Sequence, residues 1–532
     1  MRYRSTPWLA AAALAAGCAA PGAGGPGGPA PLGASISARG GAEQPAPPRA
    51  PIAIPAPTVP GAECAPAGAS DPAATLRRAA EVTGVARLDG KLLRIRHADV
   101  RLELHQSDRS YAPFFATVSR RESWVDPAAG VQRWTDETTY IQSELPPMQW
   151  LADARGVYQL RDTGAVAAPG MYLLASADRP LDMATVLGDW LAAGGARVVG
   201  RCAYRDYPRL VLGRTTPAGE ERLYLDPKSG APVAYVRPEA HYLWGPVRAE
   251  YVYTNWILAG GVRYPGSSFR ILDGEVERSR TVSDVAVVPP DSAPSLRLPA
   301  ASADMRGAME KALAQAPDTI RVGEHAFLLR TPNYTSGVAL VGDTVFVLDA
   351  TLGEQRARQD SAWIARLFPG RHPVALVVTD LAWPHIAGVR FWAANGAVVY
   401  SHPASRAFLE RVVDRRWTER PDLLERRRGR ARMVFRPVTQ PASLAGGALR
   451  LVPLDGMGSE GAIVAYLRDE RFLWAGDYVQ NLREPTLYAS DVRDAVRRAG
   501  LTPERVGAMH IRAASWSVVE ALVGAPKPAA QP

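Results

Sequence analysis

Hydrophobic and polar residues follow two different periodicities in the two halves of this chain. A helical pattern over residues 73–82 comes first, and Gly84 then ends the predicted helix. Beyond it the pattern has a period of two, as in Leu92-Leu-Arg-Ile-Arg-His, and pairs of turn residues such as Gly260-Gly261 interrupt it. The pattern predicts a hairpin over residues 223–236. Residues 71–300 are therefore predicted to form a mainly antiparallel β domain.

Many hairpins after one early helix resemble, by arrangement, the half-barrel of periplasmic lipoprotein carriers. In those proteins the concave face of the sheet holds acyl chains. The resemblance implies an apolar or envelope ligand for this domain. The alternative is a sheet whose inner face is filled by its own side chains. The sequence leaves both interpretations open.

Strands and helices alternate in the second half of the chain. Buried apolar runs at residues 338–341, 344–350 and 374–378 predict strands, and residues 361–367 and 386–394 have helical spacing. A longer helix is predicted after Pro403. Residues 301–318 read as a helical linker, and residues 319–526 as a second domain. The expected fold class of the whole chain is α+β.

The central stretch of this domain, Val374–Gly388, reads V-A-L-V-V-T-D-L-A-W-P-H-I-A-G. A buried strand that runs into Asp380 and His385 at a helix start resembles the metallo-β-lactamase superfamily signature, in which the strand is followed by T-H-x-H-x-D-H. Ala382 stands at a histidine position of that signature, and Pro384 stands at its aspartate. The resemblance implies an αββα sandwich over residues 319–526.

Members of that superfamily bind two metal ions, usually zinc. Carried over by position, the three histidines of the first metal become Asp380, Ala382 and Gly458. At the second metal position, His385, Asp477 and His510 match the expected ligands, whereas Pro384 does not. A classical β-lactamase activity is not expected, because it relies on the metal position that has lost its ligands.

The spacing of the histidines argues against a metal site within one short segment, and this argument does not depend on the family resemblance. The chain has eight, and no two of them are two, three or four residues apart. A site would therefore have to be assembled from distant residues. One hypothesis is a single divalent ion, zinc by preference, on His385, Asp477 and His510. In that hypothesis Asp380 supplies a fourth oxygen or acts as a base.

The sequence therefore leaves open whether the protein is an enzyme. A single-metal site would suit a hydrolase of an ester, thioester, lactone or phosphoester. The competing hypothesis is an inactive hydrolase homologue that serves as an envelope binding or scaffold protein. No serine-hydrolase elbow, phosphate-binding glycine loop or Cys-x-x-Cys motif is present.

The first residues of the chain have the features of an export signal. Arg2 and Arg4 precede a short Ala/Leu run that ends in Leu14-Ala-Ala-Gly-Cys18, which resembles a bacterial lipobox. The resemblance implies residues 1–18 as a lipoprotein signal peptide, lipidation of Cys18 and, because Ala19 follows, an outer-membrane location. An ordinary signal peptide or an uncleaved anchor are the alternatives. Pro, Gly and Ala dominate residues 19–70, which are predicted to be a disordered tether.

Composition and charge add two further expectations. The chain is 47% hydrophobic and 22% charged, with a net charge of +9 that comes mostly from Arg. The arginine cluster at residues 415–432 is interleaved with Asp and Glu, so it is predicted to be the solvated face of a helix rather than a nucleic-acid site. Cys64 and Cys202 could pair in an oxidising periplasm, or remain two unpaired thiols.

Overall fold

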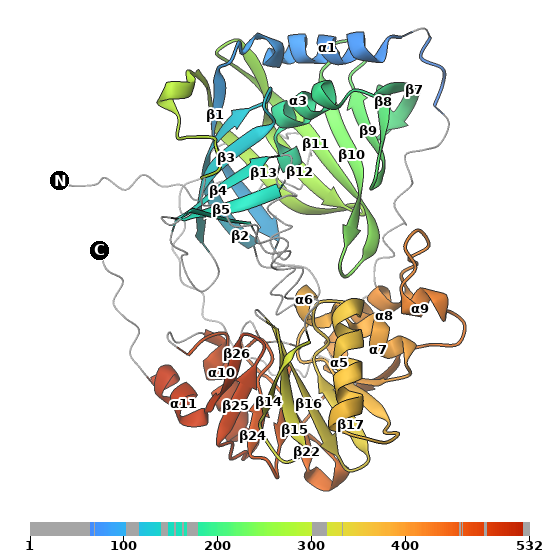
Figure 1. Ribbon diagram of the computed structural model, residues 1–532, viewed down its shortest axis with the longest axis vertical. Coiled ribbons are helices and arrows are strands. Elements are labelled where there is room, and N and C mark those ends of the chain that lie inside the picture. The colour runs from blue at the N-terminus through green and yellow to red at the C-terminus, as the bar shows by residue number, and fades with distance from the viewer. Residues whose placement is uncertain are drawn as a thin grey trace, which may run out of the picture. The chain divides into compact units, whose positions relative to one another are not determined.

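In the computed structural model (Figure 1), the described residues are 64–68, 70–102, 116–139, 147–153, 156–161, 164–167, 179–299, 316–331, 334–456, 459, 461–482 and 487–524. The lipobox with Cys18, most of the predicted tether, Gly458 and nearly all of the linker at 301–318 lie outside these residues. Residues Pro57–Pro532 form one compact unit.

The first half forms a single antiparallel sheet of 13 strands in the order β6-β5-β4-β3-β2-β1-β13-β12-β11-β10-β9-β8-β7. The strands are β1 (Leu92–Leu102), β2 (Ala116–Asp126), β3 (Val131–Thr139), β4 (Met148–Asp153), β5 (Gly156–Arg161), β6 (Gly164–Ala167), β7 (Arg197–Tyr204), β8 (Tyr207–Thr216), β9 (Gly219–Leu225), β10 (Pro232–His241), β11 (Gly245–Ala259), β12 (Val262–Leu272) and β13 (Glu275–Val288). Neighbours in sequence pair with each other except β6 and β7, which lie at the two ends of the strand order, and β1 joins β13. The antiparallel β character predicted for this half is observed.

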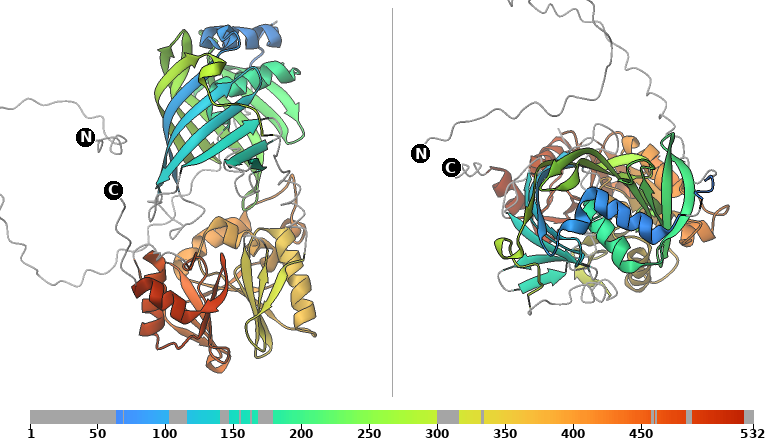
Figure 2. Two further views of the ribbon diagram at one scale, coloured as in Figure 1. Left: turned by 60° about the vertical axis from the view of Figure 1, so that its left-hand side comes forward. Right: turned by 90° about the horizontal axis from the view of Figure 1, so that it is seen from above.

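Two helices pack on this sheet, which curls around them in Figure 2. Helix α1 (Pro72–Thr83) begins where Asp71 caps the amides of Ala73 and Ala74, and ends at Gly84 as predicted. Helix α3 (Met183–Ala193) was not predicted. It is apolar around most of its circumference, so it lacks the one-sided spacing that reveals a surface helix. The buried side chains of both helices belong to the same core as the sheet.

The short turns next to these helices are η1 (Val85–Arg87), η3 (Arg179–Leu181) and η4 (Pro290–Ser292).

A network of buried charges occupies part of β1 and its neighbours. The carboxylate of Asp99 binds both Nε and Nη2 of Arg280, at 2.9 and 3.0 Å, and Nη1 of Arg121 at 3.1 Å. His97 lies 2.9 Å from Asp99 and 3.0 Å from the hydroxyl of Ser123. His97 is therefore a packing residue of the sheet, held by its own hydrogen bonds.

The second half contains two mixed sheets. The seven-stranded sheet has the order β14-β15-β16-β17-β18-β19-β20, and the six-stranded sheet has the order β21-β22-β23-β24-β25-β26. The first comprises β14 (Asp318–Arg321), β15 (Ala326–Arg330), β16 (Thr335–Val341), β17 (Thr344–Leu348), β18 (Val374–Val377), β19 (Val398–Ser401) and β20 (Val434–Pro437). The second comprises β21 (Ala442–Leu444), β22 (Leu449–Pro453), β23 (Ile463–Leu467), β24 (Phe472–Trp474), β25 (Arg505–Ala508) and β26 (Ile511–Ser515).

One apolar core joins these two sheets face to face. It contains Leu328 and Phe346 from the seven-stranded sheet and Leu451 and Trp474 from the six-stranded sheet. A second core packs helices onto the outer face of the six-stranded sheet, and the largest core packs helices onto the outer face of the other. The layers are therefore helices, sheet, sheet and helices. Mixed sheets with helices agree with the predicted α+β class.

The helices and turns of this half are α5 (Glu354–Leu367), α6 (Trp383–Ile386), α7 (Val389–Ala394), η5 (Pro403–Ser405), α8 (Arg406–Asp414), α9 (Leu423–Arg426), η6 (Ala445–Gly447), α10 (Leu487–Arg498) and α11 (Trp516–Gly524). The single helix predicted over residues 386–394 is divided into α6 and α7. The division has a local cause, because Gly388 donates its N–H to the carbonyl of Ala350 at 2.7 Å and leaves no room for a larger residue.

The arginine cluster is not the continuous helix that the sequence predicts. Helix α8 ends at Asp414, and only the four-residue α9 follows within the cluster. Arg390 causes this end, because its guanidinium donates to the carbonyls of Val412, Val413 and Arg415 and binds Asp422 with two hydrogen bonds. A contact from outside the segment thus overrides its local helical pattern.

Arg415 itself donates to the carbonyls of Trp244 and Pro246 and pairs with Asp273 at 2.6 Å. Part of the predicted solvated face is therefore engaged with the first sheet.

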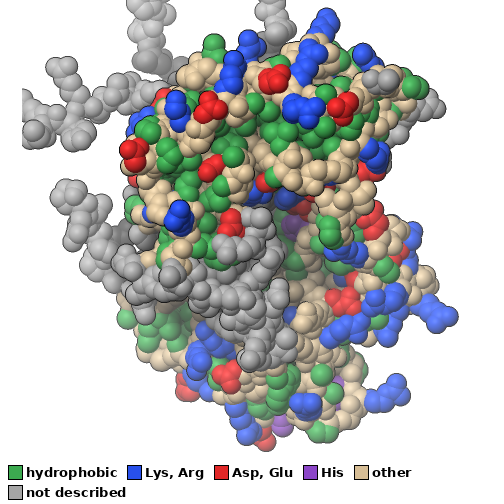
Figure 3. Space-filling model, turned by 45° about the horizontal axis from the view of Figure 1, so that its top comes forward, with side chains coloured by type: hydrophobic (Ala, Val, Ile, Leu, Met, Phe, Trp, Pro, Cys, Tyr) green, Lys and Arg blue, Asp and Glu red, His purple; other side chains and the backbone are tan. Residues whose placement is uncertain are grey.

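Three further observations concern the periphery of the fold. Cys64 and Cys202 form a disulfide, and Ala65 pairs with Arg201 beside it. On the face drawn in Figure 3, Lys and Arg are interspersed with Asp and Glu. No helix among the described residues has the length and hydrophobicity needed to span a bilayer.

The buried position of His97 predicts a loss of stability in acid. Burial first, and then the charge of Arg280, lower the pKa of His97 to about 4, against the opposing pull of Asp99. The unfolded chain binds a proton at this residue near pH 6.5, whereas the folded chain does not. The free energy of unfolding should therefore fall as the pH drops from about 6.5 to about 4, by about 3 kcal/mol in total.

Urea unfolding of wild type and of His97→Gln, each at pH 7 and pH 4.5, isolates this contribution. The variant is expected to lose less stability than wild type over that interval, because it lacks the titrating ring. Equal losses in both proteins would contradict the assignment.

Candidate metal centre

Four polar residues of the second half lie just beyond the ends of strands from both sheets. Asp349 directly follows β17, and Asp380 comes three residues after the end of β18. On the other sheet, Asp477 follows β24, and His510 lies between β25 and β26. Strands β17 and β18 are parallel, so their carboxyl ends lie at the same edge of the seven-stranded sheet. Strands β24 and β25 are also parallel, so their carboxyl ends share an edge of the six-stranded sheet. The backbone N–H of Ile463 donates to the carbonyl of Thr379 at 2.9 Å and joins the two edges.

Backbone hydrogen bonds hold the short turn that carries His385. The N–H of Ala350 donates to the carbonyl of His385 at 2.9 Å, and the N–H of Leu352 donates to the carbonyl of Pro384 at 2.8 Å. Pro384 suits the first turn of α6, where a missing N–H is not needed. His385 is thus fixed on both sides by the loop that follows β17.

Asp380 orients the ring of His385. Its Oδ1 lies 2.9 Å from Nδ1 of His385 and accepts the N–H of Ala382 at 2.8 Å, and its Oδ2 lies 3.2 Å from the hydroxyl of Thr379. The sequence left two roles open for Asp380, a fourth ligand or a base. In the structure its carboxylate also positions His385, whose Nε2 faces Asp477, and the two roles stay predictions.

His385, Asp477 and His510 form a group that could hold a metal ion, since one potential ligand atom from each lies within 4.8 Å of the other two. Oδ1 of Asp477 is 3.1 Å from Nε2 of His510 and 3.9 Å from Nε2 of His385. Zinc bonds of roughly 2.0–2.1 Å in a tetrahedral site place neighbouring ligand atoms about 3.4 Å apart. The observed separations therefore bracket the spacing that such an ion needs.

Two of these ligand atoms are buried without a hydrogen-bond partner among the described residues, namely Oδ1 of Asp477 and Nε2 of His510. The two atoms form an ion pair with each other at 3.1 Å rather than a regular hydrogen bond, and a cation between them would satisfy both. The second oxygen of Asp477 accepts a hydrogen bond from Gln480 at 3.1 Å. The donor set of two imidazoles and one carboxylate, with a carboxylate behind His385, therefore fits a divalent cation.

Buried charges couple the protonation of these groups. Burial disfavours the charged form of His385, but Asp380 and Asp477 outweigh this effect and raise its pKa to about 9. Burial acts against the carboxylate of Asp477, yet His385 and then His510 hold its pKa below the usual value. A cation would therefore have to displace a proton from His385, so its binding should strengthen as the pH rises.

A second buried carboxylate lies behind this group. Asp349 accepts the N–H and the hydroxyl of Thr379 at 2.8 and 2.7 Å, and the indole N–H of Trp474 at 2.7 Å. Burial first, and then the neighbouring Asp380, raise the pKa of Asp349 to about 7. This arrangement supports Thr379, and through it the loop that carries Asp380.

The other sequence-predicted positions hold no ligand atoms. Ala382 contributes its N–H to Asp380, and Pro384 contributes its carbonyl to Leu352. Gly458 lies outside the described residues.

Sequence reasoning assigned no role to Asp349, Trp474, Gln480 or Tyr334. The ring of Tyr334 lies 5.2 Å from that of His510 and 6.0 Å from that of His385, so it packs on both imidazoles. Asp349 and Trp474 could have been noticed as polar atoms at the ends of buried strands. Gln480 and Tyr334 carry no signal in the sequence, because only the folding of distant loops brings them to the site.

Comparisons with known proteins gave matches at the level of structure alone. No protein-family model and no curated protein matches the chain. Similar solved structures include the DIM-1 metallo-β-lactamase and TMB-1, each at 13% identity, and a metallo-β-lactamase from Erythrobacter litoralis at 15%. Each match has a TM-score of 0.31 and covers 39% of this chain and 95–96% of the other.

At this identity and TM-score the likeness says nothing about activity. The layered sandwich therefore rests on the sheets and cores of this chain itself.

The close approach of Gly476 to the Asp380 loop predicts a site-specific effect of substitution. A Cβ at Gly476 would overlap the hydroxyl of Thr379 and lie 3.3 Å from Oδ2 of Asp380. Gly476→Ala should therefore lower the free energy of unfolding by roughly 1–3 kcal/mol through overpacking. The left-handed backbone at φ +56° adds roughly 1–2 kcal/mol.

Gly500→Ala is the matched control, because Gly500 has φ +60° but nothing within 4 Å of a Cβ. It should show only the backbone cost when both variants are unfolded in urea. Equal losses for the two variants would mean that Gly476 does not restrain the loop.

Proposed function

We propose that the second half of this protein binds one divalent cation, zinc by preference, and hydrolyses an ester, thioester, lactone or phosphoester. The observation that carries this proposal is the pair of buried ligand atoms on Asp477 and His510, which lie 3.1 Å apart near His385 and make no regular hydrogen bond to any described residue. A divalent cation, when bound, supplies Lewis acidity and lowers the pKa of water.

In this proposal, other residues of the chain orient the side chains that bind the ion. Asp380 holds His385 in the tautomer whose Nε2 is free to bind, because the carboxylate accepts the hydrogen from Nδ1. Gln480 fixes one oxygen of Asp477 and leaves the other for the site. The side chain of His510 is a quarter exposed, whereas those of His385 and Asp477 are buried, so the substrate would approach from the side of His510.

A second candidate is a scaffold that binds an envelope partner and catalyses nothing. The pKa of His385 near 9 favours it, because a protonated ring between Asp380 and Asp477 already pairs with both carboxylates and offsets part of their charge. In that case the three side chains interact with one another and bind no metal ion. The two candidates differ in one measurable quantity, the metal content.

Metal analysis of the purified full chain at pH 8 separates the two candidates. The hydrolase proposal expects about one equivalent of zinc in wild type and a negligible amount in the double variant His385→Ala/His510→Ala. His325→Ala is the control, since this exposed histidine lies outside the group and should leave the content unchanged.

Negligible metal in all three proteins would end the hydrolase proposal and leave the scaffold. Where zinc is found, Asp380→Asn should weaken its binding by roughly 10–100-fold, since the variant keeps the ligands but loses the charge behind His385. Hydrolysis of a panel of simple esters, thioesters, lactones and phosphoesters would then identify the bond that is cleaved.

We also propose that the protein is exported and anchored in the outer membrane through a lipid on Cys18. The disulfide between Cys64 and Cys202 supports export, because such bonds persist in oxidising compartments and are rare in the cytosol. Intact-mass analysis of the mature protein should find a chain that begins at Cys18 and carries acyl groups, and Cys18→Ser should remove them. An unmodified N-terminus at another residue would contradict the anchor.

A further inference from the structure

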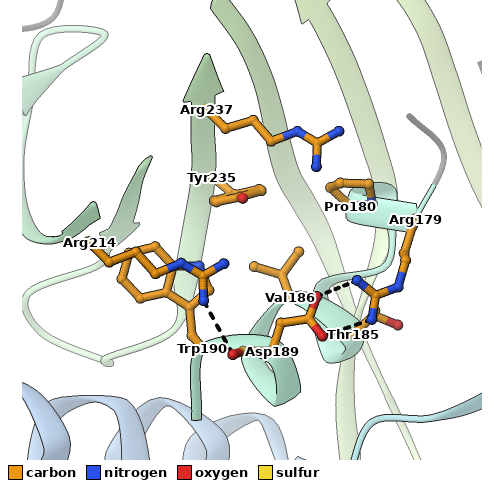
Figure 4. A pocket seen from close by; sticks show the side chains of 9 residues that line it. All are labelled: Arg179, Pro180, Thr185, Val186, Asp189, Trp190, Arg214, Tyr235 and Arg237. Carbon is orange, nitrogen blue, oxygen red and sulfur yellow. Dashed lines mark hydrogen bonds and ion pairs between the residues drawn. The ribbon is translucent and has the colours of Figure 1, made fainter. Parts of the chain in front are cut away.

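A small cavity lies in the first half of the chain, where α3 meets η3 and the strands β8 and β10 (Figure 4). Its volume is about 40 Å³. One buried water needs roughly 10–15 Å³ on the same measure, so the cavity has room for about three waters or for one small oxyanion. It lies apart from the candidate metal centre, and nothing in the proposed hydrolysis uses it.

The unsatisfied polar atoms on the cavity lining are all donors. Trp190 is fully buried, and its indole N–H has no hydrogen-bond partner among the residues that the structure describes. The Nε–H of Arg179 is also buried and has no hydrogen-bond partner among the described residues. Leaving a buried donor unpaired costs roughly 1–3 kcal/mol, and neither group can accept a hydrogen bond. A ligand that completes this lining must therefore present acceptor atoms.

The charge of the lining points to a negative ligand. The guanidinium groups of Arg179, Arg214 and Arg237 surround the cavity in Figure 4, together with the single carboxylate of Asp189. These four groups give the lining a formal charge of +2. Asp189 is already engaged by Arg179, at 2.5 and 2.8 Å.

The remaining two arginines are held mainly by residues outside the lining, and Arg214 also donates Nη1 to the carbonyl of Asp189 at 3.2 Å (Figure 4). Arg214 donates Nε to Glu221 at 2.6 Å, and Arg237 donates Nε to Glu239 at 2.8 Å, and neither glutamate lines the cavity. The guanidinium of Arg214 also lies 4.6 Å above the ring of Trp190. These contacts fix both cations in place before any ligand arrives, which reduces the ordering cost of binding.

We propose that this cavity binds a small oxyanion, a carboxylate or a phosphate group. Guanidinium groups match both of these acceptors, and the indole N–H of Trp190 adds a neutral donor. The size of the cavity admits the anionic group itself and excludes a bulky one. The group can come from a free ion or from the head of a lipid, and both sources share this chemistry.

Titration calorimetry of the full chain with inorganic phosphate, and separately with acetate, in a chloride buffer tests the proposal. Wild type should bind at least one of the two anions. Trp190→Phe keeps an aromatic ring beneath Arg214 but removes the N–H, and should weaken binding about tenfold. Arg237→Gln should weaken it by at least as much.

The matched control is Trp134→Phe. Trp134 is also buried with an unpartnered indole N–H, but it packs against Trp150 and does not line the cavity. Its variant should bind the anion as wild type does. Near-UV circular dichroism checks that every variant is folded.

No binding of either anion by wild type, or equal binding by wild type and both cavity variants, would overturn the proposal. A vesicle experiment identifies the source. Binding to vesicles of phosphatidylglycerol with phosphatidylcholine, but not to phosphatidylcholine alone, and its loss in Trp190→Phe, would assign the site to a lipid head. Phosphate binding without vesicle binding would assign it to a free ion.

Discussion

The buried carboxylate of Asp349 is the contact on which the candidate metal centre depends. It accepts hydrogen bonds from Thr379 on its own sheet and from the indole of Trp474 on the other, so it links the two sheets at the edge where the polar residues gather. A carboxylate without exposure to water is stable only with such partners. Its demand for donors therefore fixes Thr379, and the position of Thr379 fixes the loop that bears Asp380 and His385.

The residues that support the candidate metal centre differ from the residues that would bind the ion. The carboxylate of Asp380 and the amide of Gln480 hold His385 and Asp477, yet neither belongs to the group that could bind an ion. Such hydrogen-bond partners matter only where the side chains that they hold must point in one particular direction. The structure thus fixes the orientation of His385 and Asp477 through residues that lie outside the group.

The sequence predicted the elements whose residues determine their own conformation. The capped helix α1, the hairpin of β9 and β10 and the buried strand β18 were all evident from local patterns. It failed for α3, which is apolar on most sides because it is enclosed by the sheet, and for the arginine segment, whose helix Arg390 ends from a distance. At the site, spacing and resemblance named His385, Asp477 and His510, but the role of Asp380 and the presence of Gln480 depend on contacts between distant loops.

The bond between Cys64 and Cys202 has a mechanical consequence. It joins the chain covalently to β7, eight residues before α1 begins. A pull on the residues that precede Cys64 would pass through the disulfide into β7 and would bypass α1. The fold could therefore withstand traction from its amino-terminal side without its first helix being peeled away.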